Sequence, residues 1–289
     1  ARLFDVKTHG WMNVQASHLN LPLGREEEAV ALLNAAALLI PYLPALAASS
    51  PMYDGELQDA VDNRLAWILQ HQARIPESCG DIVPEFVHSL SDYRKNILGP
   101  MYQALDHLPD SGVLRHEFFN ARGAVIKFSR KAMELRVLDV QECVKMDVAI
   151  AVFARAVLRH LAARLRTGRL RLPDHSVLVN DFRSAVWQGS AARVRAPHVG
   201  GVERDAEGRA DIRDVLRELL SIARKTVRKD EAAYLDLVEP VVERGSLSER
   251  IRQHLLPHVD DDEGFTEAAR RLYIELADCL DGNEVWRGR

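Results

Sequence analysis

The sequence predicts an α+β fold in which a few mostly antiparallel strands are backed by many helices. Residues 11–23 lack a helical apolar stripe and are closed by Pro22 and Gly24, which is typical of a strand that enters a turn. Residues 113–140 have the pattern of a β-hairpin. Most of the remaining chain spaces its apolar residues as helices do. Few strands and many helices together indicate the α+β class.

The most apolar segment, residues 29–48, follows the first predicted strand and is expected to be a helix buried in the core. The acidic residues 26–28 stand in its first turn, where they suit the helix dipole. Its length is sufficient to cross a bilayer. Asn34, Pro41 and Pro44 argue against a membrane span, because proline breaks a helix and a core helix explains the same composition. We therefore expect no membrane partner.

Helices are expected to fill most of the chain after this segment. Their predicted ranges are 59–72, 87–98, 144–165, 211–228, 231–243, 247–256 and 265–280. Two segments rich in glycine, proline or charge, 76–84 and 195–210, are expected to be loops, and the second is a candidate mobile lid.

The hairpin is expected to have its first strand at 116–119, its turn at 120–123 and its second strand in the long run 124–140. Alternation along this second strand places Glu134 and Arg136 on one face, whereas Leu135 and its apolar neighbours point the other way.

Composition limits the class of partner. The 289 residues are 47% hydrophobic, enough for one large domain or two modest ones. A formal net charge of −4 gives no general attraction to nucleic acid or anionic membranes, so a small molecule or a protein is the favoured partner. The three cysteines are odd in number and far apart, which fits neither a disulfide framework nor a paired zinc site. A cytoplasmic location is expected, and an oligomer is possible.

Two polar pairs carry the chemistry of the chain. His18 and Asn20 share one face of the first predicted strand, as Glu134 and Arg136 do on the later one. A histidine and a glutamate can hold a hard metal ion, and an arginine beside them can bind a phosphate with its fork of donors. The alternative interpretation is a satisfied buried ion pair, because such pairs are common.

The residues around these pairs resemble the glutamate–cysteine ligase family, type 2. The two strand motifs are Ser17–Pro22, which reads SHLNLP, and Met133–Asp139, which reads MELRVLD. Similarity continues in the same order through further segments: Thr8–Trp11, Pro44–Pro51, Gly55, Arg64 and Asp181–Arg193. The resemblance covers residues 1 to about 195, and the helical tail is similar only in general character.

This resemblance implies a fold like that of glutamine synthetase, a curved and mostly antiparallel sheet that forms a funnel backed by helices. In such carboxylate–amine ligases ATP phosphorylates the side-chain carboxylate of glutamate, and an amine attacks the acyl phosphate to give a gamma-glutamyl amide. Carried over, His18 and Glu134 would be Mg²⁺ ligands, and Glu134 and Arg136 would be the catalytic residues, with Arg136 stabilising the transferring phosphoryl group. Asn20 and Arg64 would bind substrate, Arg64 through a carboxylate.

The implied organisation is a catalytic core at residues 1–195, with a helical region at 196–289 packed on the same domain. The implied partners are a glutamate-like acid and an amine, with ATP and Mg²⁺ as cofactors.

The sequence departs from the family pattern at its start. The family's first strands, which carry closely spaced metal-binding glutamates, should precede the first motif, so the chain is expected to correspond to the C-terminal portion. Glu26–Glu28 begin a helix and do not replace those strands. We therefore expect either that an N-terminal fragment supplies the remaining ligands, or that the chain is a catalytically inactive scaffold that binds a nucleotide, an amino acid or a protein.

Overall fold

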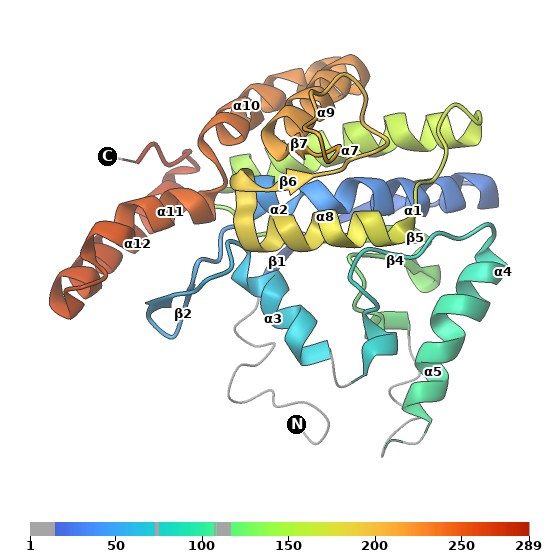
Figure 1. Cartoon of the computed structure of the whole chain (residues 1–289), viewed down its shortest axis with the longest axis horizontal. Coiled ribbons are helices and arrows are strands. Elements are labelled where there is room, and N and C mark those ends of the chain that lie inside the picture. The colour runs from blue at the N-terminus through green and yellow to red at the C-terminus, as the bar shows by residue number, and fades with distance from the viewer. Residues whose placement is uncertain (1–14, 73–74, 107, 109–116, 289) are drawn as a thin grey trace.

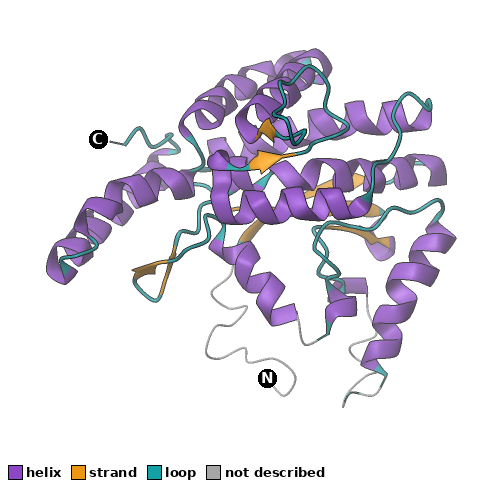
Figure 2. Ribbon diagram, in the orientation of Figure 1, coloured by secondary structure: helices purple, strands orange, loops and turns teal. Residues whose placement is uncertain are grey.

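The computed structural model describes residues 15–72, 75–106, 108 and 117–288, and it has helices packed around a small sheet (Figures 1 and 2). The sheet contains β1 (Ala16–Pro22), β4 (Ala124–Lys127) and β5 (Ala132–Asp139). Its strand order is β1-β5-β4, and both pairings are antiparallel. The predicted α+β class is confirmed. The first predicted strand is confirmed from residue 16, and its residues 11–14 lie outside the described part of the chain.

An irregular register between β1 and β5 shapes the centre of the sheet. Ser17 pairs with Leu138 and Leu19 with Leu135, so His18 alone lies opposite two residues of β5. Such a bulge bends the strand locally and aims side chains away from the regular alternation. Beyond it, Asn20 pairs with Glu134 in regular register.

The predicted hairpin is correct in kind but wrong in its first strand and turn. Residues Glu117–Phe119 form a 3-10 turn, and His116 lies outside the described residues. The chain reverses instead at Phe128–Arg130, which splits the long predicted strand into β4 and β5. This turn lacks the glycine or proline that usually marks one, and Lys131 adopts a left-handed φ of 49°. The Glu117 carboxylate closes the turn by accepting hydrogen bonds from the backbone N–H groups of Phe128 (2.8 Å) and Ser129 (3.2 Å).

The apolar segment after β1 forms the central core helix, α1 (Glu26–Leu39), followed by a 3-10 turn and α2 (Pro44–Ala47). Every residue from 33 to 48 is buried. The amide of Asn34, within this stretch, donates from Nδ2 to the carbonyl oxygen of Val87 (2.9 Å) and accepts from the N–H of Val87 (3.0 Å). The Tyr42 hydroxyl donates to Oδ2 of Asp181 (3.4 Å). Across the described residues, no helix has the length and low polarity that a bilayer crossing requires.

The helix predicted at 87–98 begins later and runs further than expected. It starts with α4 (Leu90–Tyr93), where the Ser89 side chain accepts from the N–H of Asp92 at 2.9 Å, passes through a π-helical turn and continues as α5 (Gly99–Leu105). Gly99 and Pro100 do not stop it, because proline is compatible with the first turn of the helical segment that follows.

The remaining helices are labelled in Figure 1, and among them α7 packs most extensively against α1. Their bounds are α3 (Asn63–Gln72), α7 (Val144–Arg166), α8 (His175–Gln188), α9 (Ile212–Thr226), α10 (Leu235–Arg244), α11 (Leu247–Leu255) and α12 (Asp262–Gly282). The predicted helices at 59–72, 144–165 and the four C-terminal ranges are thus confirmed within a few residues, and α8 was given no bounds from sequence. The predicted loop 195–210 is also confirmed, flanked by the short strands β6 (Arg193–Val194) and β7 (Ala210–Asp211).

Two apolar clusters hold these helices. The main core unites the sheet, α1 and α7 with α9 and α10. A smaller cluster joins α11 and α12 through Leu247, Ile251 and Leu272, and the short hairpin β2 (Met52–Tyr53) and β3 (Glu56–Leu57) packs against it. In Figure 1 the α11 and α12 helices extend away from the body of the molecule. The division of the chain at residue 195 stays a prediction.

Candidate functional site

Glu134 lies at the centre of a cluster of basic side chains on one face of the sheet. Its Oε1 atom is 3.2 Å from Nε of Arg136, 3.6 Å from Nδ1 of His18 and 3.8 Å from Nζ of Lys127. Arg136 also donates from Nη1 to the carbonyl oxygen of Asn120 at 2.6 Å. The structure therefore brings the two predicted polar pairs together, and one carboxylate oxygen fixes the side chains around it.

His18 is a neutral partner in this cluster at neutral pH. Burial lowers its pKa below the usual value, and the positive charge of Arg136 lowers it further, against the opposing effect of Glu134. Its contact with Glu134 is therefore a polar contact rather than an ion pair near pH 7. The other interpretation of these polar pairs, a buried ion pair, therefore applies to Arg136 and Glu134 but not to His18.

Lys127 is the site residue that sequence reasoning missed. Val125 pairs with Glu134 across the sheet, so Lys127, two residues further along β4, projects to the same face. Its side chain is fully buried, and burial together with the charge of Arg136 lowers the pKa of its ammonium to about 8. Placing the hairpin turn at residues 128–131 would have identified Lys127 as a site residue. Val125 would then lie opposite Glu134, and Lys127 would project to the same face as both of them.

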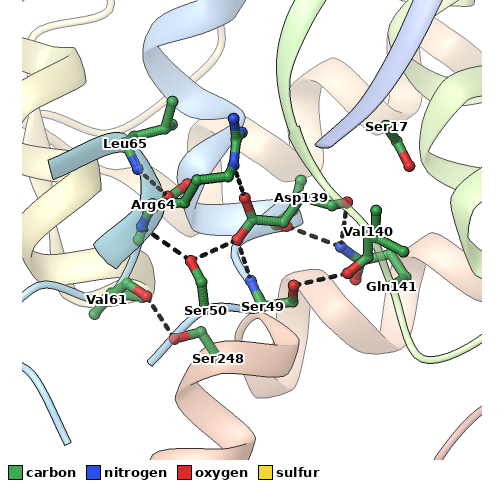
Figure 3. Close-up of polar contacts among 12 residues, drawn as sticks. Ser17, Ser49, Ser50, Val61, Arg64, Leu65, Asp139, Val140, Gln141 and Ser248 are labelled. Atoms are coloured by element: carbon green, nitrogen blue, oxygen red, sulfur yellow. Dashed lines mark hydrogen bonds and ion pairs between the residues drawn. The ribbon is translucent and has the colours of Figure 1, made fainter. Parts of the chain in front are cut away.

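Arg64 is held at the start of α3 by a buried network (Figure 3). Its Nε donates to Oδ1 of Asp139, and its backbone N–H donates to Oγ of Ser50 at 3.1 Å. The other carboxylate oxygen of Asp139 accepts from the N–H of Ser49 and the hydroxyl of Ser50, both at 2.8 Å. Three segments distant in sequence thereby position one guanidinium.

One nitrogen atom of this guanidinium makes no hydrogen bond to the described residues. Nη2 of Arg64 is buried and has no hydrogen-bond partner among the described residues, although the side chain as a whole is only 6% exposed. A buried donor without a partner costs about 1–3 kcal/mol, so an acceptor that reaches Nη2 would recover that free energy.

A cavity of about 230 Å³ gives access to this cluster, with His18, Arg64 and Arg136 in its lining. Its other walls are aliphatic or formed by backbone: Ala16, Leu65, Ile68, Ile82, Ala121, Gly123 and Val137. Ile82 adopts a left-handed φ of 67°, which is strained for a β-branched residue. Asn20 pairs with Glu134 in register but is exposed and lies outside this lining.

The described residues do not form a magnesium site by themselves. No group of three or more histidine, cysteine, aspartate or glutamate side chains lies together anywhere in that part of the chain. His18 and Glu134 offer one nitrogen and one carboxylate, whereas Mg²⁺ requires an octahedral set of mainly oxygen ligands. Arg136 and Lys127 also compete for the same carboxylate. The cluster as it stands suits an anion better than a divalent cation.

Comparison with known proteins identifies relatives over most of the chain. The family model described as Glutamate-cysteine ligase family 2 matches residues 2–275. An uncharacterized protein of Archaeoglobus fulgidus is 36% identical over 99% of this chain and 68% of its own length. A Nocardioides sp. protein named "Putative glutamate--cysteine ligase 2-1" is 27% identical over 87% of this chain, which spans 56% of that relative.

Among solved structures, the glutamate–cysteine ligase of Francisella tularensis in complex with AMP has a similar fold. Its TM-score is 0.51 with 13% sequence identity, and the match covers 87% of this chain and 59% of that chain. At this identity the likeness concerns the fold alone.

Proposed function

Because the chain belongs to glutamate–cysteine ligase family 2, we propose that it is an ATP-dependent carboxylate–amine ligase that forms a gamma-glutamyl or similar amide. The substrates would be glutamate or a similar acid, and an amine such as that of cysteine. The observation that carries the proposal is the convergence of Arg64, Arg136 and His18 on one cavity beside Glu134. The AMP in the Francisella complex supports a nucleotide as a ligand of this fold.

In the proposed reaction the side-chain carboxylate of the acid attacks the γ-phosphorus of ATP, and the bond to the β-phosphate oxygen breaks to release ADP. The amine then attacks the acyl carbon, inorganic phosphate leaves with the bonding electrons, and the amine nitrogen loses a proton. Little covalent help is needed from the protein, because positioning and charge neutralisation supply most of the rate in phosphoryl transfer.

Four residues of the site have proposed roles in this scheme. Arg136 neutralises charge on the transferring phosphoryl group, and Glu134 fixes the Arg136 guanidinium from 3.2 Å. Arg64 anchors a substrate carboxylate through its available Nη2. Asn20, exposed beside Glu134, is the proposed supporting polar contact.

Mg²⁺ remains part of the proposal only as a cofactor whose ligands are largely supplied elsewhere. His18 and Glu134 are proposed as two of them, and the others would come from substrate phosphates, water or residues beyond the described ones. The small number of acidic ligands among the described residues also favours a second candidate function, a scaffold that binds a nucleotide, amino acid or protein without turnover. We propose a cytoplasmic location, with which the free cysteines Cys79, Cys143 and Cys279 agree.

The test is release of ADP in a screen of glutamate and related acids against varied amines. Glu134→Gln and Arg136→Ala are expected to abolish ADP release while the far-ultraviolet circular dichroism stays unchanged. The matched control is Arg183→Gln, which removes an exposed arginine paired with Asp81 and should leave turnover intact. Undiminished turnover in either site variant would refute the assignment, and absence of ADP release with every pair would favour the scaffold.

A further inference from the structure

A second cavity, of about 390 Å³, lies where α10 and α11 meet the C-terminal tail, residues 283–288. It shares no lining residue with the cavity beside Arg64. Figure 1 shows this tail returning from α12 toward the junction of the two helices. The tail is fastened there, because the N–H of Trp286 donates to Oε1 of Glu142 at 3.2 Å and Arg250 donates to the carbonyl oxygen of Trp286. Hydrogen bonds between distant segments thus hold the walls of the cavity.

Three arginines from three segments line this cavity. Arg244 ends α10, Arg250 lies in α11 and Arg287 belongs to the tail. Burial lowers the pKa of Arg250, Glu142 raises it, and the positive charge of Arg244 lowers it, so the two helices hold their guanidinium groups near one another. Within the described part of the chain, neither Arg244 nor Arg287 forms an ion pair with a carboxylate. Because like charges repel, an anion between these groups would stabilise them.

The carboxylates near this cavity are engaged elsewhere. Glu142 accepts from the backbone of Trp286, and Glu275 accepts from its indole N–H at 3.1 Å and lines the neighbouring pocket instead. The carboxylates of α10 are paired with arginines of α9, and they are Asp236, Glu239 and Glu243. Three guanidinium groups against Glu142 and Glu275 leave the surroundings of the cavity positively charged.

The floor of the cavity suits a hydrocarbon group. The lining residues other than the arginines are Met146, Leu237, Pro240, Val241, Val285 and Trp286. The guanidinium of Arg250 lies over the Trp286 ring, 4.7 Å from its centroid, so charge and apolar surface adjoin. The volume lies within the range of about 300–1,000 Å³ that is typical of small-molecule sites. An inorganic anion by itself would leave most of this volume and the apolar floor unfilled.

We propose that this cavity binds an organic phosphate monoester, with the phosphate between Arg244, Arg250 and Arg287 and the hydrocarbon body on the apolar floor. A phosphate monoester carries close to two negative charges near pH 7 and three terminal oxygens, so it can accept from the donor forks of several arginines at once. A carboxylate offers a single charge and two oxygens. The site is separate from the ligase cavity, so the proposal does not depend on the proposed function.

The experiment measures the binding of phenyl phosphate, inorganic phosphate and benzoate by isothermal titration calorimetry at pH 7.5. Phenyl phosphate is expected to bind about tenfold more tightly than inorganic phosphate, because its ring covers the apolar floor. It should exceed benzoate by a similar factor, because the carboxylate has less charge for the arginines. Equal binding of inorganic phosphate would contradict the role of the floor, and equal binding of benzoate would contradict the choice of phosphate.

Variants of the arginines locate the binding. Arg244→Gln, at an exposed position without an ion pair to the described residues, should weaken phenyl phosphate about tenfold while the circular dichroism stays unchanged. Arg250→Lys keeps the charge but loses the donor fork, and it should also weaken binding. The matched control Arg224→Gln removes an exposed arginine of α9 and should leave the affinity unchanged. Unchanged affinity in Arg244→Gln would overturn the proposal.

The cavity beside Arg64 also contains arginines, so a further variant separates the two sites. Arg136→Gln should leave the affinity for phenyl phosphate unchanged, because Arg136 lines only the other cavity. If Arg136→Gln abolishes binding and Arg244→Gln does not, the phosphate occupies the ligase cavity and this inference falls, whereas the proposed ligase function is unaffected. If Arg244→Gln weakens phenyl phosphate but no acid and amine release ADP, the second site stands and the ligase proposal falls.

Discussion

Replacing Asp139 by Asn tests whether the network behind Arg64 holds the site together. Asp139 is 2% exposed, and its carboxylate accepts from Arg64, from the hydroxyl of Ser50 and from the N–H of Ser49. The substitution keeps the shape but removes the charge that compensates a buried guanidinium. Breaking a buried pair by removing one partner costs about 3–5 kcal/mol, because the remaining charge has no counter-ion.

We expect Asp139→Asn to lower the free energy of unfolding by about 3–5 kcal/mol in urea titrations followed by circular dichroism. The control is Asp81→Asn, which breaks the exposed pair with Arg183 and should cost less than about 1 kcal/mol. A loss below about 1 kcal/mol for Asp139→Asn would refute the reasoning, since Arg64 would then be stabilised by something other than this carboxylate. A double variant, Arg64→Met with Asp139→Leu, should recover part of the loss because no uncompensated charge remains.

Two further predictions concern packing and pH. A Cβ on Gly123 would lie 2.6 Å from a methyl of Val137, so Gly123→Ala should cost about 1–3 kcal/mol of unfolding free energy, whereas Gly200→Ala, with nothing within 4 Å, should be nearly neutral in the same urea titration. Burial lowers the pKa of His198 to about 4, so the unfolded chain binds a proton between about pH 6.5 and pH 4 that the folded chain does not. Stability from His198 is therefore complete above pH 6.5 and is lost as the pH falls toward 4. His198→Phe, which can keep the ring contact with Tyr42, should flatten this part of the curve, and an unchanged slope would contradict the assignment.

Sequence alone predicted which residues share a face of each strand, because the alternation of side chains along a strand is a local property. His18, Glu134 and Arg136 could be placed on their faces from alternation, and the register confirms that the two faces meet. Arg64 was proposed from resemblance only, since its contact with Asp139 joins residues 75 positions apart. The roles of these residues stay predictions.

The elements that sequence failed to place depend on distant partners. The turn at Phe128–Arg130 carries no glycine or proline that would mark it in the sequence. It is stabilised instead by Glu117, which accepts from the N–H groups of Phe128 and Ser129 and lies eleven residues before Phe128. Lys127 was missed as a consequence, since the chain was expected to continue as a strand through it. The late start of α4 follows from Ser89, whose capping hydroxyl was not weighed against the apolar pattern.

Asn34 shows how a single amide can specify an arrangement that apolar packing alone leaves free. An all-hydrocarbon surface on α1 would accept the segment near Val87 in several sliding positions of similar free energy. The paired hydrogen bonds between the Asn34 amide and the Val87 backbone are satisfied in only one of them. The chain segment that Asn34 holds at Val87 also contains Glu85, which pairs with Arg122, and Ile82, which lies in the cavity wall. A residue that does not line the cavity thus holds a chain segment close in sequence to Ile82 in its wall.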